Sequence, residues 1–528
     1  GNRISDAHII LNNLIRKKCH QNNSKIYSCF IDFSKAFDTI PRDKLLNKLL
    51  SYNIKGNFFN IIKNIYSNDK ACIKINNTDL TCDFEINQGV KQGCILSPFL
   101  FNIYLADLPK CLESNIIETN SNDKNPNCLL WADDIILLSD NEEGLKKRLK
   151  SMEGYCELNE LILNTDKTKC MIFNKTGRLI RTFFSFKDTR LETVKSYKYL
   201  GFVITPSGEI LTGIKDLRDR AMKAYYKIKA SLGYNFDKNV KLAIKLFDAL
   251  VKPILLHASD FWGCMKLPKS NAIDNFHMMV CKQILGVQKQ TTNIGVLLEL
   301  GRVPLNLYAK KSAIKNWERI KLGKTNTMVS HSYKLASECN LLWTENIKNL
   351  LERNGLACFY KNASQTDQLF IHKKSFQRLC DKFHQEAFST LREDSSKLRT
   401  YGLIKTEIGI ESYLEEISNP TLRKALTRFR LSNHSLNIEK GRHNNIPRDL
   451  RYCPFCTNSV ETEIHFLLEC NIYKDEREHL LNSTPFARLI LSPFEKFIYA
   501  FSKLQAINIA KFVFESFEKR KQLLDENG

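Results

Sequence analysis

The stretch that decides the fold is Cys128-Leu129-Leu130-Trp131-Ala132-Asp133-Asp134-Ile135-Ile136-Leu137-Leu138, where two adjacent carboxylates interrupt an apolar run. Apolar residues on both sides of a short polar break predict a strand, a tight turn and a second strand, with the acids at the tip. Burying an unpaired carboxylate is costly, so the pair needs a cation, hydrogen-bond donors or solvent there. Taken alone, Asp133 and Asp134 would also suit an exposed turn.

A further acid ends another apolar strand earlier in the chain. The stretch Tyr27-Ser28-Cys29-Phe30-Ile31-Asp32-Phe33-Ser34-Lys35-Ala36-Phe37-Asp38 runs from a strand directly into Asp32 and then turns toward a helix. Carboxylates combined with substrate phosphates suit Mg²⁺, or Mn²⁺ in its place. Two such ions about 4 Å apart can activate an attacking hydroxyl and hold the leaving phosphate. The acids therefore predict a two-metal site.

Three more stretches occur in a fixed order with these acids, the first between Asp32 and Asp133 and the other two after Asp134. They are Gln88-Gly89-Val90-Lys91-Gln92-Gly93-Cys94-Ile95-Leu96-Ser97-Pro98, Leu163-Asn164-Thr165-Asp166-Lys167-Thr168-Lys169 and Tyr197-Lys198-Tyr199-Leu200-Gly201-Phe202. With the two acidic stretches, they resemble the successive palm motifs of reverse transcriptases. The sequence Phe33-Ser34-Lys35-Ala36-Phe37-Asp38 resembles the corresponding motif of non-long-terminal-repeat (LINE-type) retrotransposons rather than that of retroviruses. The resemblance extends to a thumb-like region at 257–305 and a zinc segment at 431–477, with a weak middle.

The resemblance implies a role for the acids and for the residues that follow Asp32. Asp32 and Asp133 would hold both metal ions with help from the Phe33 carbonyl, and Asp134 would be their companion carboxylate. Ala36 and Phe37 would lie in the nucleotide site, where the Phe37 ring under the sugar excludes a 2′-hydroxyl. A Phe in the hydrophobic core is the alternative for Phe37.

The later motifs carry further expectations. Gln92 and Gly93 would touch the incoming nucleotide and the template, since glycine allows close approach and positive φ. Lys167 or Lys169 would donate a proton to the leaving pyrophosphate, although a surface lysine is the alternative for each. The 197–204 stretch, followed by a Pro-Ser-Gly turn, predicts a hairpin that grips the primer end. Trp131 stands where the family usually has Tyr or Phe.

A metal motif lies near the C-terminus. Cys453, Cys456, His465 and Cys470 give the spacing C-x2-C-x8-H-x4-C, and these are the soft and imidazole ligands of a tetrahedral zinc site. Four protein ligands close the coordination shell, so one structural Zn²⁺ is expected. Basic residues nearby, from Arg442 to Arg451, predict contact with RNA or single-stranded DNA. Three buried cysteines and a helical histidine are the alternative.

Charge and composition agree with these motifs. The 79 Lys and Arg against 57 Asp and Glu leave +22, which attracts polyanions such as nucleic acid. The 17 cysteines, without a recognisable secretion signal, indicate a reducing compartment, so we expect an intracellular protein of nucleus and cytoplasm. Apolar runs are too short for a membrane span.

The predicted fold class is α+β: a right-hand polymerase palm, made of an antiparallel sheet with helices on one side, then a helical thumb and a small zinc knuckle. The expected divisions are a palm with residual fingers at 1–205, a thumb at 206–330, a helical connector at 331–445, a CCHC knuckle at 446–480 and a helical end at 481–528. The start at Gly1 looks like a point just upstream of the first catalytic Asp, so an N-terminal truncation is expected.

The expected function is RNA-directed DNA polymerisation by two-metal nucleotidyl transfer, with an RNA template, a DNA primer and deoxynucleoside triphosphates as partners. The intact acids Asp32, Asp133 and Asp134 favour this function. The alternative is a catalytically inactive relic of the same element that still binds nucleic acid.

Overall fold

The computed structural model of the chain describes residues 3–67, 69–75, 79–114, 126–233, 236, 238–268, 271–361, 371–393, 397–481 and 490–526. The chain forms two compact units. Unit 1 comprises residues 1–213 and 319–347, and unit 2 comprises residues 214–318 and 348–528. The five-part division expected from the sequence is finer than these units and stays a prediction.

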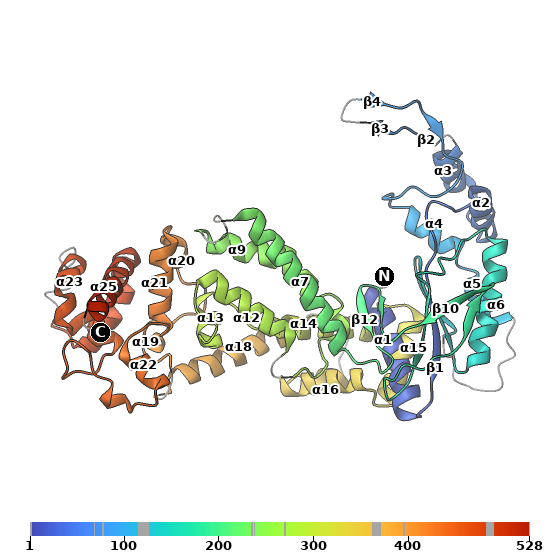
Figure 1. Cartoon of the computed structure of the whole chain (residues 1–528). Helices are drawn as coiled ribbons and strands as arrows, with labels where there is room; N and C mark the ends of the chain where they lie inside the picture. The colour runs from blue at the N-terminus through green and yellow to red at the C-terminus, as the bar shows by residue number, and fades with distance from the viewer. Residues whose placement is uncertain are drawn as a thin grey trace. The chain divides into compact units, whose positions relative to one another are not determined.

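The elements follow the chain in this order (Figure 1). Up to residue 204 they are α1 Ile4–Ile15, a π-helix Arg16–Gln21, β1 Ile26–Ile31, α2 Arg42–Ser51, α3 Gly56–Ser67, β2 Lys70–Ala71, β3 Lys74–Ile75, β4 Asp79–Leu80, β5 Phe84–Glu85, α4 Ser97–Tyr104, α5 Leu108–Ser114, β6 Cys128–Trp131, β7 Asp134–Ser139, α6 Glu142–Leu158, β8 Lys169–Phe173, β9 Phe184–Phe186, β10 Thr189–Thr193, β11 Tyr197–Tyr199 and β12 Phe202–Ile204.

The described elements beyond residue 204 are all helical. They are α7 Leu211–Leu232, α9 Val240–Leu246, a π-helix Phe247–Val251, α10 Lys252–Leu255, α11 Ser259–Trp262, α12 Ala272–Leu285, α13 Asn293–Glu299, α14 Leu305–Lys321, α15 Thr327–Glu338, α16 Leu342–Arg353, α17 Ala357–Lys361, α18 Ile371–Leu391, α19 Tyr401–Ile404, α20 Tyr413–Glu416, α21 Pro420–Arg430, α22 Asn437–His443, a 3₁₀ turn Arg448–Leu450, a π-helix His465–Glu469, a 3₁₀ turn Asn471–Tyr473, α23 Lys474–Leu481, α24 Pro493–Lys503 and α25 Ala506–Glu526.

A six-stranded sheet in the order β6-β7-β1-β8-β10-β9 forms the centre of unit 1. Antiparallel pairing joins β1 to β7 and β8, β6 to β7, and β9 to β10, while β8 and β10 are parallel. The α+β class and the mostly antiparallel sheet are thus confirmed. A separate β11–β12 hairpin is present where the sequence predicts one.

Both faces of the sheet are covered, so the expectation of helices on one side only was wrong. On one face, Cys29 and Ile31 of β1 belong to a core cluster with Leu145 and Leu149 of α6. On the other face, Phe30 stacks on Tyr197 of β11 with ring centroids 4.2 Å apart. Figure 1 shows α6 on one side of the sheet, and α1 with α15 on the other. Central strands with two covered faces are apolar throughout, which explains the uninterrupted run from residue 135 to 138.

Helix α6 is fixed to the sheet by polar contacts at its start. The Asn141 side chain accepts a hydrogen bond from the Gly144 amide at 2.7 Å and caps the helix. Arg148 is only 2% exposed and donates to the Leu138 carbonyl at 2.6 Å and to Asn127 Oδ1 at 2.9 Å. These bonds tie the helix to β7 and to Asn127, the residue before β6. They therefore anchor the hairpin of β6 and β7 that carries the acid pair.

In unit 2, the segment with the Cys/His motif packs on the C-terminal helix α25. Glu461 and Arg520 form a buried two-bond ion pair at 3.0 and 2.8 Å. Phe466 stacks on Phe517 with centroids 4.7 Å apart. Separating such a buried pair would leave an uncompensated charge on each side, which costs several kcal/mol. These contacts therefore hold the Cys/His segment against α25.

Among the described helices, none combines the length and apolar character needed to cross a bilayer.

Candidate active site and metal centre

The acids of the first two motifs lie at one end of the paired strands β1 and β7. Ile31 pairs with Ile135, so Asp32 and Asp134 come next on their strands at the same end. Trp131 pairs with Asp134, which leaves Ala132 and Asp133 as a two-residue turn. Ala132 has φ +51°, as the first turn residue of the primed hairpin turns requires. The predicted hairpin with the acids at its tip is confirmed.

Repulsion among the acids is visible at Asp134, whose side chain is partly buried. Burial and the charges of Asp133 and Asp32 raise its pKa from 3.8 to about 6. The same acids act on Tyr197, whose pKa is raised to about 12 by burial first and then by Asp134 and Asp32. A divalent cation would remove this repulsion, so the carboxylate set fits a metal site.

The three carboxylates do not converge on one point in this structure. Among the described residues, three or more ligand atoms close enough to share an ion are found in the Cys/His motif of unit 2 and not in these acids.

A loop at residues 162–168 braces Asp32 from behind. Thr168 Oγ1 accepts a hydrogen bond from the Asp32 amide at 3.2 Å, and the Asn164 amide donates to the Asp32 carbonyl at 2.8 Å. Lys167 Nζ lies 3.8 Å from Asp32 Oδ2 and its side chain is 70% exposed. Lys169 Nζ instead pairs with Glu192 at 2.7 Å. Of the two lysines considered from the sequence, Lys167 is therefore the one beside the acids.

The residues expected around the nucleotide differ in environment. Ala36 and Phe33 are buried, and Phe37 is partly buried with its ring stacked on Phe101, centroids 4.9 Å apart. One face of Phe37 thus packs on the core, and the ring remains partly accessible. This arrangement is compatible with both readings of Phe37, as a core residue and as a sugar contact.

The glycine-rich loop at residues 88–93 presents its polar groups to solvent. Gln92 Nε2 donates to Asp38 Oδ1 at 2.7 Å. Gly93 has φ +82°, and a Cβ built there would meet no described atom within 4 Å. Gly89, at φ +81°, lies against Asp38, because a Cβ there would be 2.6 Å from the Asp38 carbonyl oxygen. Glycine is required by packing at 89 and by backbone conformation at both positions.

Arg42 holds this loop in place, and sequence reasoning missed it. Its guanidinium donates to the Gly89 carbonyl at 2.9 Å, to the Tyr66 carbonyl at 2.9 Å and to Asp69 Oδ2 at 2.8 Å. It also lies over the Tyr66 ring, 5.0 Å from the centroid. The only signal in the sequence is an Arg at the first position of a helix, which does not reveal contacts so far along the chain.

In unit 2, the four residues of the Cys/His motif come together. Their ligand atoms all lie within 4.8 Å of one another, and Cys453 and Cys470 are buried. Cys470 Sγ is 3.9 Å from Cys453 Sγ and 3.5 Å from Cys456 Sγ. Cys453 and Cys456 lie on a turn where the Thr457 amide donates to the Cys453 carbonyl, and Cys470 follows the His465–Glu469 turn.

The chemistry of this cluster fits zinc. His465 Nε2 is buried and has no hydrogen-bond partner among the described residues, while Nδ1 lies 3.3 Å from Glu469 Oε2. A ligating histidine is commonly oriented by a carboxylate in this way. Contact with Cys470 lowers the pKa of the Cys453 thiol, whereas contact with Cys453 raises the pKa of the Cys470 thiol. Cys453 is thus favoured as a thiolate, whereas Cys470 would need a bound cation to lose its proton.

The basic residues beside the motif are less available than the sequence indicated. Arg442 pairs with Glu439 at 3.2 Å. Arg451 donates to the carbonyls of Ile446 and Ile438 at 2.9 and 2.7 Å, and its stem packs against Gly441. These two side chains hold the segment together.

Residues 3–204 match the family described as Reverse transcriptase (RNA-dependent DNA polymerase). The chain is 30% identical over 187 residues to a Pol polyprotein of a type-1 retrotransposable element R2 of Popillia japonica, covering 34% of this chain and 26% of that protein. It is 24% identical over 269 residues to the RNA-directed DNA polymerase of the mobile element jockey of Drosophila funebris, covering 49% and 28%. The chain therefore spans less than a third of each relative.

Among solved structures, a telomerase from Candida tropicalis in complex with a fragment of telomeric RNA aligns with 12% identity. The alignment covers 62% of this chain and 51% of that chain, with a TM-score of 0.31, which is too low to inform the fold.

The raised pKa of Asp134 leads to a prediction about stability in magnesium-free buffer. The folded protein binds the Asp134 proton more tightly than the unfolded chain does, so stability falls as the pH rises from about 3.8 to about 6. Asp134→Asn removes the repelled charge and should stabilise the protein at pH 7.5 by roughly 1–3 kcal/mol, with no gain below about pH 4. Urea unfolding at both pH values measures this. A variant less stable than the parent at pH 7.5 contradicts the prediction, and Asp188→Asn, at the exposed β9–β10 turn, is the control.

The Cys/His cluster leads to a prediction about metal content. Elemental analysis should find one zinc per chain, and Cys453→Ser with Cys456→Ser should lose it. Hydrogen exchange after chelation should show lost protection around residues 451–473 and unchanged protection in β1 and β7, because unit 1 has its own core. Cys358→Ser with Cys380→Ser, outside the cluster, should keep the zinc. Zinc-free parent protein would refute the site.

Proposed function

We propose that this chain is an RNA-directed DNA polymerase of a LINE-type, non-long-terminal-repeat retrotransposon, because residues 3–204 match the reverse transcriptase family and the relatives above come from such elements. The reaction joins the 3′-hydroxyl oxygen of a DNA primer to the α-phosphorus of a deoxynucleoside triphosphate. The bond to the β,γ-pyrophosphate breaks, and the hydroxyl proton is lost. The RNA template selects the nucleotide by base pairing.

The observation that carries the proposal is that Asp32, Asp133 and Asp134 lie at the same end of β1 and the β6–β7 hairpin. Asp32 and Asp133, with the Phe33 carbonyl, are the proposed ligands of two Mg²⁺ ions, or Mn²⁺. Bound there, the ions would activate the attacking hydroxyl and stabilise the charge on the leaving phosphate. Asp134 adds a third carboxylate beside them, and its raised pKa, caused first by burial and then by the charges of Asp133 and Asp32, supports a cation at this place.

The residues around the acids are proposed to position the nucleotide. Phe37 would place its accessible ring edge beneath the sugar, with Phe101 supporting it from the core. Gln92 and Gly93 lie on the exposed loop held by Arg42, and no described atom lies within 4 Å of a Cβ built at Gly93, so a nucleotide can approach the backbone there. Lys167, beside Asp32, is the proposed proton donor to pyrophosphate. Ala36 is buried in the core cluster against which Phe37 packs, and it is proposed to support the nucleotide site from there.

The proposed partners are an RNA template, a DNA primer and deoxynucleoside triphosphates, and the surplus of positive charge suits all of them. The proposed role of zinc is structural, because Cys453, Cys456, His465 and Cys470 fill a tetrahedral shell. Action in the nucleus and cytoplasm stays a prediction.

Loss of one metal ligand should abolish synthesis. Asp133→Asn keeps the shape of the side chain and removes a charge, so incorporation of deoxynucleotides on a primed RNA template should fall at least about a hundredfold. Asp188→Asn, which also changes an Asp at a hairpin turn of the same sheet, should retain activity. Full activity in Asp133→Asn would sink the assignment.

Sugar selection should depend on Phe37. Phe37→Val opens space for a 2′-hydroxyl, so incorporation of ribonucleotides relative to deoxynucleotides should rise roughly tenfold or more. The ratio separates this role from a core role, because a weakened fold lowers both reactions together. Phe58→Val, on the exposed face of α3, is the matched control and should leave the ratio unchanged. An unchanged ratio in Phe37→Val would place the ring in the core alone.

A further inference from the structure

A pocket of about 570 Å³ opens in unit 2, outside the candidate active site and the Cys/His cluster. Its volume lies within the range of about 300–1,000 Å³ that is usual for ligand pockets. Four segments line it: the α12–α13 loop, one face of α21, the α21–α22 loop with α22, and one face of α25. We propose that this pocket binds an unpaired nucleotide of a single-stranded nucleic acid together with its neighbouring phosphates.

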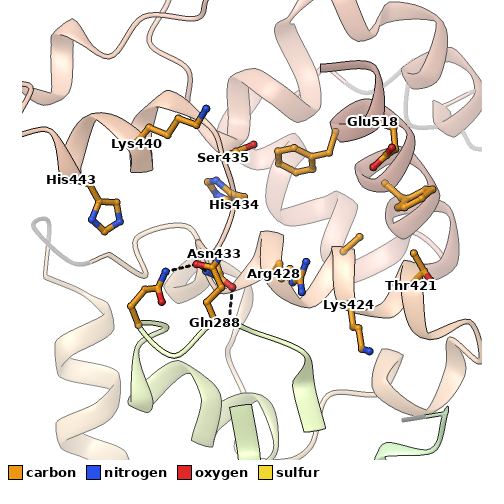
Figure 2. Close-up of a pocket in the computed structure, with 14 residues that line it drawn as sticks. Gln288, Thr421, Lys424, Arg428, Asn433, His434, Ser435, Lys440, His443 and Glu518 are labelled. Atoms are coloured by element: carbon orange, nitrogen blue, oxygen red, sulfur yellow. Dashed lines mark hydrogen bonds between the residues drawn. The ribbon is translucent and has the colours of Figure 1, made fainter. Parts of the chain in front are cut away.

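Positive side chains border the pocket on two sides. Figure 2 shows Lys440 and His443 on one side and Lys424 with Arg428 on the other. Within the described part of the chain, Lys424, Arg428 and Lys440 form no ion pair that would neutralise them. Arg428 Nε donates to the Gly286 carbonyl at 2.9 Å, which holds the guanidinium in place. Lys424 lies with its stem against Gly286, since a Cβ there would be 2.6 Å from Lys424 Cγ.

Aromatic and amide groups lie between these charges. Phe514 and Phe517, one turn apart on α25, line the pocket and are partly buried, so part of each ring is accessible for stacking. Asn433 and Gln288 fix each other through two hydrogen bonds of 3.0 and 3.1 Å. Charged groups around aromatic rings and amides are what a nucleotide requires: cations for the phosphates, a ring for the base face and amides for its edge.

His434 gives the floor of the pocket an unused polar atom. Its side chain is 2% exposed, and Nε2 lies 3.1 Å from Glu463 Oε1. Nδ1 has no hydrogen-bond partner among the described residues. The ring stacks on Phe517, with centroids 6.1 Å apart. The Arg399 guanidinium donates two hydrogen bonds to the Glu463 carboxylate, at 2.8 and 2.9 Å, so this buried carboxylate is held in place beneath the pocket.

Single-stranded rather than double-stranded nucleic acid fits this arrangement. Bases of a duplex are stacked and paired, so they cannot enter a pocket to reach Phe514, whereas an unpaired base can. An acidic peptide is the other ligand that the cations would attract. Glu518 is the one acid among the residues that line the pocket, and its charge opposes such a peptide only weakly. The aromatic rings, which such a peptide would not need, therefore decide for the nucleotide.

This inference goes beyond the polymerase function, because it concerns binding by unit 2 and does not require catalysis in unit 1. The test uses the full chain and fluorescence anisotropy with a labelled oligo(U) RNA, an oligo(dT) DNA of equal length and a duplex, over a range of salt concentrations. Lys424→Gln with Lys440→Gln removes two phosphate contacts. Phe514→Leu keeps an apolar side chain and removes the ring. Circular dichroism checks that each variant is folded.

We expect the double variant to reduce the salt slope for single strands by about 1.4, from a slope of about 0.7 per phosphate contact. Phe514→Leu should weaken single-strand binding roughly fivefold or more and leave duplex binding unchanged. The matched control, Lys382→Gln with Lys474→Gln, removes two exposed charges of the same unit and should leave affinity unchanged. A difference between the RNA and DNA arms identifies the natural strand.

Failure of this proposal and failure of the polymerase function give different results. If both pocket variants bind single strands with the parent's affinity and salt slope, the pocket proposal is overturned, whatever the polymerase activity. If both single strands and the duplex lose affinity equally in Phe514→Leu, the ring has no stacking role and the proposal is likewise overturned. If the chain shows no polymerase activity while the variants lose single-strand binding, the polymerase function fails and the pocket stands.

Discussion

Asp32, Asp133 and Asp134 are held at one end of apolar strands by the register that pairs Ile31 with Ile135. Their mutual repulsion is not relieved by any described basic group except Lys167, 3.8 Å from Asp32. The sheet therefore holds charge that only a cation or solvent can compensate. Three features keep this end of the strands in place against that repulsion. Both faces of β1 and β7 are covered, Thr168 accepts a hydrogen bond from the Asp32 amide, and Arg148 anchors α6 to β7.

Local patterns predicted the parts of this arrangement that depend on neighbours in sequence. The turn at Ala132 and Asp133 follows from an apolar run broken by two acids, and the Cys/His cluster follows from its spacing. Arg42, Thr168 and Tyr197 were not assigned to the site because their contacts depend on segments brought together by folding. The cover on the second face was also missed, although the unbroken apolar run in β7 was a signal for it.

The two units divide the proposed tasks between chemistry and binding. In unit 2, the pair Glu461 and Arg520 fixes the Cys/His segment on α25, and the same helix carries the rings that line the pocket. Glu463, two residues before His465, holds the pocket's His434. Metal binding and the shape of the pocket thus share one structural support, so loss of zinc is expected to disturb strand binding before it disturbs the sheet of unit 1.

Primer extension on an RNA template by the 528-residue chain tests the central claim most directly, with Mg²⁺ present and with Mg²⁺ withheld. The primer is oligo(dT) on poly(A), and labelled deoxythymidine triphosphate reports each addition. A polymerase built on these acids predicts stepwise extension that requires Mg²⁺ or Mn²⁺ and releases one pyrophosphate per nucleotide. Tight binding of the primed template without any extension, at every metal concentration, would contradict the account and leave a nucleic-acid-binding protein without catalysis.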